Sequence, residues 1–176
     1  RVVGVDLSAG LLSTARDRAR DRGFALELVQ GDAAALPLAT DSVDLAVYVA
    51  TLHHLPTREA RRRSLDELAR VLSTDGRALV SVWSTAHDRF DSEEQGRDAG
   101  SSVDSGGERG DPRDHDGGFD TTGDWKLPGG ETVPRFYHIY DPDEFDGDLT
   151  ASDLAVESSR ISSGNCYAVV TEQKRP

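Results

Sequence analysis

Side chains able to do chemistry follow three successive apolar segments near the start of the chain. Asp6 ends the first segment, Gly31 and Asp32 follow the second, and His53 and His54 follow the third. Because the carboxyl ends of parallel strands line one edge of an open sheet, we expect these side chains to share a crevice. Asp6 suits the two hydroxyls of a ribose, and Asp32, after a glycine that lets backbone approach closely, suits an adenine amino group. The pattern predicts a nucleotide-type cofactor site, with the histidines facing the reacting atoms.

The spacing of apolar residues predicts the elements that must position those side chains. We expect helices to start at the capping residues Ser8 and Thr57, and the first helix to end at Gly23. A loop begins at Pro37, and a turn is expected at 73–76. Strands are predicted over 1–6, 24–30, 43–50, 77–83, 156–162 and 166–171, with the last two joined as a hairpin. This order predicts an α/β fold with a doubly wound, mostly parallel sheet and a C-terminal antiparallel hairpin.

The strand at 43–50 is nearly continuous in apolar residues, which predicts a buried central strand. The segment 91–122 is dense in Asp, Gly, Ser and Arg, so we predict a disordered polar insertion there. The aromatic-rich segment 125–140 follows, and Pro142 is typical of the first turn of a helix. We expect the whole chain, residues 1–176, to be one domain.

Composition narrows the class of protein further. The net charge is -12, from 32 acidic and 20 basic residues, and lysine occurs only at Lys126 and Lys174. Such a surface is typical of salt-loving archaea, although an ordinary acidic soluble protein also fits. The single cysteine, Cys166, fits a reducing cytoplasm, and no membrane span or secretory signal is predicted. Because methionine is absent and residue 1 is arginine, we expect the chain to be N-terminally incomplete.

Several motifs occur together in the first half of the chain: Val3-Gly4-Val5-Asp6-Leu7-Ser8, Gly31-Asp32-Ala33, Leu36-Pro37-Leu38, Asp41-Ser42-Val43-Asp44-Leu45, and Glu67-Leu68-Ala69-Arg70-Val71-Leu72 followed by Asp75-Gly76-Arg77. The set resembles the class I S-adenosylmethionine-dependent methyltransferases, which have a Rossmann-like fold. The resemblance implies S-adenosylmethionine as cofactor. It places the cofactor contacts at Asp6, Leu7, Gly31, Asp32, Ala33 and Ala50.

A narrower likeness covers more of the chain, through Leu52-His53-His54-Leu55 with Arg61-Arg62, Ala78-Leu79-Val80-Ser81-Val82-Trp83, Arg135-Phe136-Tyr137-His138-Ile139-Tyr140 and Gly164-Asn165-Cys166-Tyr167-Ala168-Val169-Val170. These motifs are similar to those of the tRNA wobble-uridine carboxymethyl methyltransferases, which methylate the carboxylate of 5-carboxymethyluridine in the anticodon loop. The resemblance implies catalytic roles for His53, His54, Arg135 and Tyr137, and substrate contacts for Arg61, Arg62, Trp125, His138 and Asn165. A carboxylate is already ionised at pH 7, so the transfer needs no strong general base.

Each assignment has a plainer structural interpretation. One of the two histidines packs under its loop, the arginines at 61–63 form a solvated helix face, and residues 135–140 form an ordinary half-buried strand. Trp125 then acts as a lid over the core. No zinc site is predicted in this chain, because it has a single cysteine.

The resemblance also implies a partner and an additional strand. Members of the family work with a small zinc-binding activator subunit, and strand addition at Phe24, Leu26 and Leu28 on the predicted sheet edge is the docking that we expect. The family's first strand and glycine-rich loop belong upstream of Val2, between the strands ending at Asp6 and Ala50.

Other functions remain open from the sequence alone. One is a small-molecule methyltransferase of quinone or lipid-precursor type, and another is a catalytically incompetent methyltransferase-like binding module. A nicotinamide dehydrogenase would also use Asp6, but the motifs at 31–33 and 36–38 do not fit it.

Overall fold

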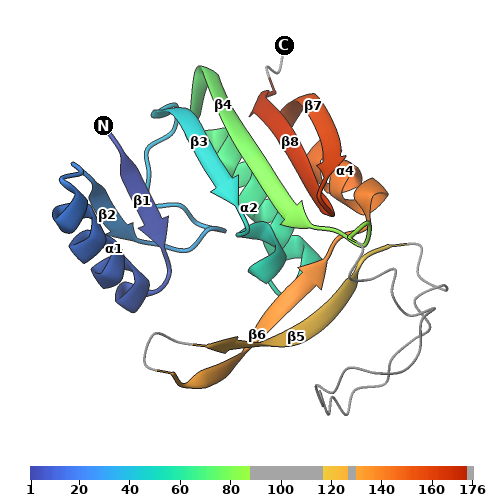
Figure 1. The fold of residues 1–176 in the computed structure, drawn as a ribbon. Helices are drawn as coiled ribbons and strands as arrows, with labels where there is room; N and C mark the ends of the chain where they lie inside the picture. The colour runs from blue at the N-terminus through green and yellow to red at the C-terminus, as the bar shows by residue number, and fades with distance from the viewer. Residues whose placement is uncertain (88–116, 127–129, 174–176) are drawn as a thin grey trace.

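The computed structural model describes residues 1–87, 117–126 and 130–173 (Figure 1). Most of the predicted insertion at 91–122 lies outside these residues. Its end does not: β5 (Phe119–Lys126) begins inside the range that we predicted to be disordered. That part of the prediction is wrong, because Phe119–Thr122 pairs with β6 (Thr132–Ile139) in an antiparallel hairpin. The backbone bonds of that ladder order a segment whose own composition is polar.

The chain opens with the parallel unit β1 (Val3–Asp6), α1 (Ala9–Arg22) and β2 (Glu27–Gln30). Ser8 caps α1 by accepting a hydrogen bond from the Leu11 N–H at 3.2 Å, as its type predicts. Gly23, at φ 70°, ends the helix. The strand predicted at 24–30 is shorter in the structure, because the Phe24 N–H donates to the Ala19 carbonyl and closes the helix instead.

A four-stranded sheet forms the body of the molecule, in the order β3-β4-β8-β7. Its strands are β3 (Val43–Val49), β4 (Leu72–Trp83), β7 (Leu154–Ser162) and β8 (Asn165–Glu172). The pair β3 and β4 is parallel, and β8 runs antiparallel to both of its neighbours, which confirms the predicted C-terminal hairpin. The predicted turn at 73–76 lies within β4, where the pairing with β3 is irregular. Val43 pairs with Leu72 and Leu45 pairs with Arg77, so four residues of β4 lie opposite one residue of β3.

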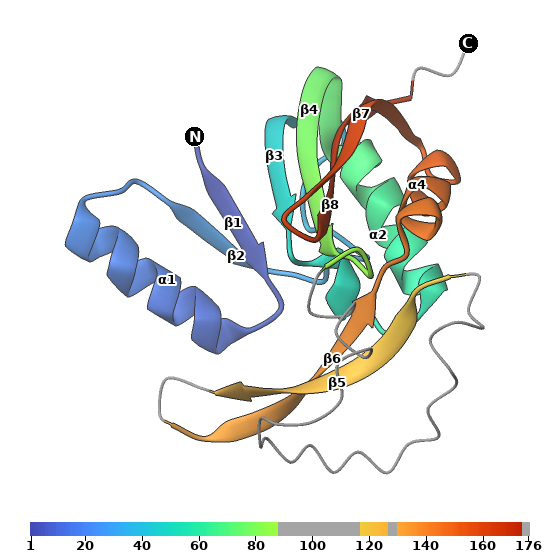
Figure 2. The ribbon, with the colours of Figure 1, turned by 45° about the vertical axis from the view of Figure 1, so that its right-hand side comes forward.

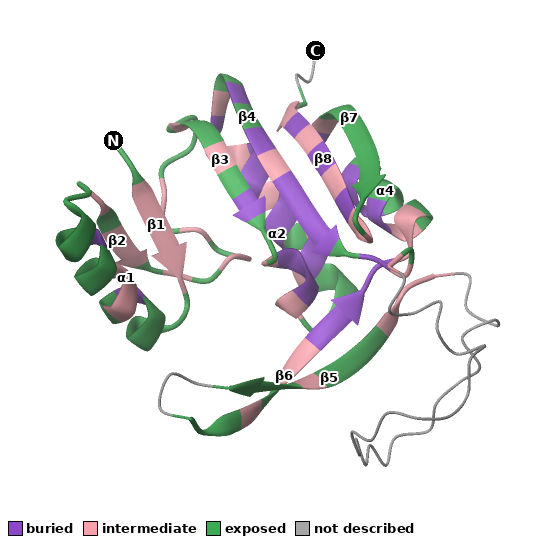
Figure 3. Cartoon of the chain, in the orientation of Figure 1, coloured by how far each residue is buried: buried purple, intermediate pink, exposed green. Residues whose placement is uncertain are grey.

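Two helices cover one face of this sheet. They are α2 (Arg58–Val71) and α4 (Pro142–Thr150), which lie behind the strands in Figure 1 and to their right in Figure 2. Thr57 caps α2 and Asp141 caps α4, with Pro142 in the first turn as predicted. The buried core lies between helices and sheet, with Leu65, Leu68, Val80 and Phe145 at its centre (Figure 3).

The opposite face of β3 is open, which corrects the prediction of a fully buried strand. Tyr48 faces the core, but Leu45 and Val47 are each 73 % exposed and Val49 is 44 % exposed. The physical reason is that α2 and α4 cover only the face to which Tyr48 points, and no element that the structure describes buries the other face of β3. β3 is also an edge strand of this sheet, and β1 pairs with β2 alone among the described residues.

The β5–β6 hairpin projects beyond the carboxyl end of β4 (Figure 1). It joins the sheet through a parallel bridge between Ser84 and Tyr140, and the Tyr140 N–H donates to the Trp83 carbonyl at 3.0 Å. Of the helices that the structure describes, none combines the length and the apolar character needed to cross a membrane.

Candidate active site

The two predicted acids lie at one edge of the β1–β2 pair. Asp6 is the last residue of β1 and is paired with Gln30, the last residue of β2, so Asp32 lies two residues beyond the end of the neighbouring strand. Asp6 accepts a hydrogen bond from the Ser8 N–H at 2.7 Å, and Asp32 accepts one from the Ala34 N–H at 2.8 Å. Each bond uses one carboxylate oxygen (Oδ1). The second oxygen is the one through which either side chain can accept a hydroxyl or amino donor.

Gly31 is required for packing at this edge. A Cβ at this position would lie 2.5 Å from Cδ of Pro37 and 3.1 Å from Val5, so only glycine fits. We predicted that Gly31 lets a cofactor approach the backbone closely. In the structure the group that lies close to Gly31 is the Pro37 ring. Leu7 is exposed, and its carbonyl accepts from the Gln30 side chain at 2.9 Å.

Backbone strain marks the end of β3. Ala50 has φ 54°, a left-handed conformation that a residue with a Cβ rarely adopts. Its N–H donates to the Ser81 carbonyl at 3.1 Å, which helps to hold it there. Ala33 is fixed nearby, because its carbonyl accepts from the Ser64 hydroxyl at 2.8 Å. Asp41 and Ser163 also have positive φ, so this strain does not by itself assign Ala50 to the cofactor, and the contact stays a prediction.

The histidine pair follows Ala50 in the short helix η1 (Leu52–His54), and its two rings have different hydrogen bonds. The Trp83 backbone N–H donates to Nδ1 of His53 at 3.3 Å, which leaves the ring proton of neutral His53 on Nε2. That Nε2 is buried and has no hydrogen-bond partner among the described residues. Nδ1 of His54 lies 3.0 Å from the Phe136 carbonyl and must donate to it, so Nε2 of neutral His54 is an acceptor.

Both histidines are held in the neutral form. Burial, reinforced by the positive charges of neighbouring groups that include Arg135, lowers the pKa of His53 to about 3. The pKa of His54 is also lowered, chiefly by burial, although its bond to the Phe136 carbonyl opposes the shift. Arg135 therefore carries the positive charge near this pair at pH 7, and the histidines offer one N–H and one ring lone pair.

Trp83 joins this cluster, and sequence reasoning did not assign it a role. Its indole stacks on the ring of Tyr137, with centroids 4.9 Å apart and planes 2° apart. The rings of His53 and His54 lie 5.9 Å and 4.8 Å from Tyr137. The sequence signal that could have found it is a tryptophan at the carboxyl end of the strand predicted at 77–83, and in the structure this side chain is 37 % exposed. Asn165, predicted to touch substrate, is the register partner of Trp83 on β8.

Two predicted substrate residues instead bind carboxylates within the chain. Arg61 is buried and donates to Glu144 at 3.4 Å. His138 lies between Asp120, 2.7 Å from Nδ1, and the same Glu144, 3.0 Å from Nε2. These contacts tie α2, α4 and the hairpin together. They occupy Arg61 and His138 internally, so direct RNA contact by these two side chains does not fit the geometry.

Arg62 is used in a similar way. Nε of Arg62 and Nε of Arg58 each donate to Oδ1 of the fully buried Asp148 at 2.9 Å. Both guanidinium groups remain part-exposed, so an external anion can still approach them. The prediction of a merely solvated helix face fails for Arg61 and Arg62, because buried carboxylates on α4 require cations opposite them.

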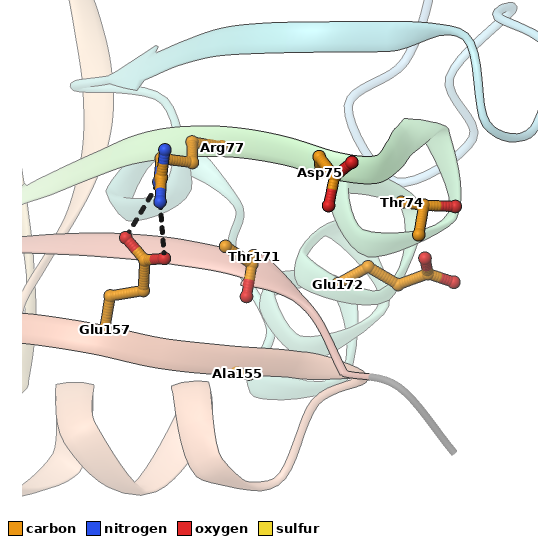
Figure 4. Close-up of a pocket in the computed structure, with 7 residues that line it drawn as sticks. All are labelled: Thr74, Asp75, Arg77, Ala155, Glu157, Thr171 and Glu172. Atoms are coloured by element: carbon orange, nitrogen blue, oxygen red, sulfur yellow. Dashed lines mark hydrogen bonds and ion pairs between the residues drawn. The ribbon is translucent and has the colours of Figure 1, made fainter. Parts of the chain in front are cut away.

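A hollow of about 560 Å³ lies elsewhere, at the opposite end of β4 (Figure 4). It is lined by Asp75, Glu157 and Glu172, and Arg77 donates to both oxygens of Glu157 at 3.0 and 3.2 Å. This end carries the amino end of β4, whereas ligands of open α/β sheets bind beyond the carboxyl ends of the strands. The candidate site therefore remains at the edge that carries Asp6 and His53.

The predicted docking residues lie on the β2 side of the molecule. Phe24 is 66 % exposed, but it precedes the strand, as does Leu26. Leu28 lies in β2 and is part-buried beside Gly4. The outer edge of β2 has no strand partner among the described residues, as the predicted strand addition requires.

Part of this chain is similar in sequence to known methyltransferases. Residues 1–80 match the methyltransferase domain family. The chain is 42 % identical over 85 residues to a putative methyltransferase of Encephalitozoon cuniculi, covering 48 % of this chain and 38 % of that protein. It is 38 % identical over 82 residues to the mouse tRNA (carboxymethyluridine(34)-5-O)-methyltransferase ALKBH8, covering 47 % of this chain and 11 % of that protein.

A third relative acts on another class of substrate. The ubiquinone/menaquinone biosynthesis C-methyltransferase UbiE of Stenotrophomonas maltophilia is 40 % identical over 85 residues, covering 47 % of this chain and 32 % of that enzyme. The chain thus spans well under half the length of the curated relatives that it matches.

Solved structures extend the likeness beyond residue 80. An S-adenosylmethionine-dependent methyltransferase of Methanosarcina mazei superposes with a TM-score of 0.68 at 18 % identity, over 97 % of this chain and 81 % of that chain. The chain therefore has the α/β, Rossmann-like fold of the S-adenosylmethionine-dependent methyltransferases, and its first 80 residues match the methyltransferase domain family.

Proposed function

We propose that this chain is the catalytic part of an S-adenosylmethionine-dependent methyltransferase that esterifies the carboxylate of 5-carboxymethyluridine at the tRNA wobble position. The observation that carries the proposal is the cluster beyond β3 and β4, where His53, His54, Trp83 and Tyr137 are in ring contact. The match of residues 1–80 to the methyltransferase domain and the likeness to a carboxymethyluridine methyltransferase support it.

The residues at the strand ends fit S-adenosylmethionine. Asp6 and Asp32 each keep a carboxylate oxygen beyond the one that bonds to the backbone, so one can accept from ribose and the other from adenine. The strained Ala50 lies between the end of β3 and the short helix that carries the histidine pair. When bound, the cofactor supplies an electrophilic methyl group on a sulfonium sulfur.

The cluster suits a carboxylate as the group that receives the methyl. The carboxylate is ionised at pH 7, so its oxygen needs no base, and the site has to hold it in line without neutralising it. Arg135 supplies a single positive charge near the pair, and His53, whose side chain is fully buried, holds the cluster in place through its ring contacts with Trp83 and Tyr137. Alignment of this kind lowers the barrier by roughly 7–11 kcal/mol in ideal cases.

Methylation of a quinone or another small molecule is the second candidate, and the likeness to UbiE favours it. That reaction places the methyl on a ring carbon and suits an apolar pocket. Arg135, next to two neutral histidines, favours an anionic acceptor instead. A non-catalytic binding module is the third candidate, and activity of the full-length protein would exclude it.

We also propose that a further β-strand, from outside these 176 residues, lies between β1 and β3 and brings the glycine-rich loop for the cofactor's methionine part. The free edges of β1 and β3 and the exposed Leu45 and Val47 support it. The test compares residues 1–176 with the full-length protein by calorimetry. S-adenosylmethionine should bind the full-length protein only, and equal affinity for both would contradict the proposal.

The small zinc-binding activator subunit is proposed to dock at the outer edge of β2, near Phe24, Leu26 and Leu28. Because Phe24 is exposed, Phe24→Asp should spare the fold and weaken capture of the subunit. Full recovery of the subunit by this variant in a pull-down would count against the docking site. The acidic, lysine-poor composition supports a salt-rich cytoplasm as the setting.

Mass spectrometry of tRNA nucleosides tests the main proposal. The full-length protein, with its activator and S-adenosylmethionine, should convert 5-carboxymethyluridine in tRNA into its methyl ester. A quinone precursor offered in parallel should remain unmethylated. Methylation of the quinone and not of the tRNA would establish the second candidate and overturn the first.

A further inference from the structure

One face of the β5–β6 hairpin carries a row of flat side chains. Trp125 pairs with Val133, and Arg135 and Tyr137 follow at two-residue steps along β6. Residues two apart on a strand share a face, and directly paired residues share it too. Trp125, Arg135 and Tyr137 therefore lie on the same side of the hairpin.

Each of these side chains contacts the next one along the row. The guanidinium carbon of Arg135 lies 4.9 Å from the centre of the Trp125 ring. Arg135 is opposite Gly123, and a Cβ on that glycine would lie 3.3 Å from the Tyr137 ring, which therefore extends over it. Tyr137 stacks in turn on Trp83, 4.9 Å away. We call Trp125, Arg135, Tyr137 and Trp83 the aromatic strip.

The strip has the surface properties of a stacking platform. Its two indoles are part-exposed, Trp125 by 45 % and Trp83 by 37 %, so both can receive a further ring. Its single charge is the cation of Arg135. The acids of β5, Asp120 and Asp124, are one residue out of phase with Trp125 and so lie on the other face.

We propose that the aromatic strip binds unpaired nucleotides of an RNA loop, with bases stacked on Trp125 and Trp83 and the Arg135 guanidinium between them. Aromatic side chains that stack on splayed bases are the usual means of recognising single-stranded RNA. The inference rests on the proposed function and deepens it, because it names the surface that holds the loop while the modified base reaches the part-buried His54.

Stacking also resolves the conflict between a net charge of -12 and an RNA substrate. Affinity that comes from phosphate contacts falls steeply with salt, by about 0.7 log units per decade for each contact on a single strand. Because the strip has one arginine, the logarithm of the binding constant should fall with the logarithm of the salt concentration at the slope expected for about one phosphate contact. Binding should therefore survive in salt that abolishes binding by a basic patch.

The two tryptophans of the chain are both in the strip, so their fluorescence reports on stacking directly. The experiment titrates the full-length protein, without cofactor, with an anticodon stem-loop RNA and with a fully paired RNA of equal length. The loop RNA should quench both Trp83 and Trp125, and the contribution of each is the part of the quenching that is lost in the W83F or the W125F variant. The paired RNA should not.

Alanine at position 125 removes the ring and should weaken loop binding by about 5- to 150-fold, whereas phenylalanine retains it. Arg135→Met should flatten the remaining salt dependence. Thr122→Ala is the matched control, because Thr122 is exposed on the opposite face of the same strand and should bind normally. Equal binding by Trp125→Ala, or equal quenching by paired RNA, would overturn the inference.

The outcome separates this inference from the proposed function. Loop-specific quenching without methylation of 5-carboxymethyluridine would sustain the strip and refute the tRNA reaction. Methylation that is unaffected in Trp125→Ala, with no quenching, would sustain the reaction and refute the strip.

Discussion

Replacing Glu144 with glutamine should loosen the attachment of the β5–β6 hairpin to the helices. The Glu144 carboxylate accepts from the Gly118 N–H at 2.8 Å, from Nε2 of His138 at 3.0 Å and from Arg61 at 3.4 Å. It thus links α4 to the start of β5, to β6 and to α2. Glutamine keeps the shape but has one acceptor oxygen and no charge, so all three donors lose their charged partner and its amide NH2 cannot accept from any of them.

The shift in the pKa of Glu144 gives the size of the expected loss of stability. Burial of Glu144 opposes ionisation, but the bonds from His138 and Gly118 and the charge of Arg61 lower its pKa from 4.5 to about 2. Each pKa unit corresponds to about 1.4 kcal/mol, so the ionised carboxylate contributes about 3 kcal/mol of stability as an upper value. Because the folded pKa is depressed, this stability is present above pH 4.5 and is lost as the pH falls toward 2.

Urea unfolding of the full-length protein, followed by tryptophan fluorescence, measures this change in the free energy of unfolding. Glu144→Gln should lower the free energy of unfolding by about 2–3 kcal/mol at pH 7, and the difference from the unaltered protein should shrink between pH 4.5 and 2. Glu131→Gln is the control, because Glu131 is exposed beside the hairpin and should change little. A Glu144→Gln protein as stable as the unaltered one at pH 7, or a difference independent of pH, would refute the reasoning.

Three further predictions concern the strand ends and the histidines. Asp6→Asn removes a charged acceptor and should weaken S-adenosylmethionine binding to the full-length protein by about 10- to 150-fold, and an unchanged calorimetric affinity would reject the role of Asp6. Gly31→Ala should destabilise the fold by about 1–3 kcal/mol, because the new Cβ would lie 2.5 Å from Cδ of Pro37, and thermal unfolding of the cofactor-free protein checks this. His53 should remain neutral down to about pH 3, so a nitrogen NMR titration that shows it protonating near pH 6.5 would contradict its hydrogen-bonding assignment.

The positions that local sequence determines were predicted well. Ser8 and Thr57 cap their helices, Gly23 ends the first one, and the C-terminal hairpin pairs as expected, because each depends on residues close in the chain. The second strand, predicted over 24–30, is shorter in the structure. Its alternating pattern begins at Phe24, but the backbone of that residue completes the helix before it.

Contacts between distant segments could not be predicted. Arg61 and Glu144 are 83 residues apart, so the sequence showed a basic helix and an acidic one but not their pairing. The stacking of Trp83 on Tyr137 likewise depends on how the hairpin leaves the sheet. The exposed face of β3 was missed because an apolar run predicts burial without naming the element that covers it.

A crystal structure of the full-length protein with bound S-adenosylhomocysteine tests the central claim most directly. The ribose hydroxyls should lie within hydrogen-bond distance of the Asp6 carboxylate, the adenine beside Asp32, and the sulfur on the side of His53 and Tyr137. A cofactor bound elsewhere, such as in the hollow lined by Asp75 and Glu157, would contradict the assignment of the site.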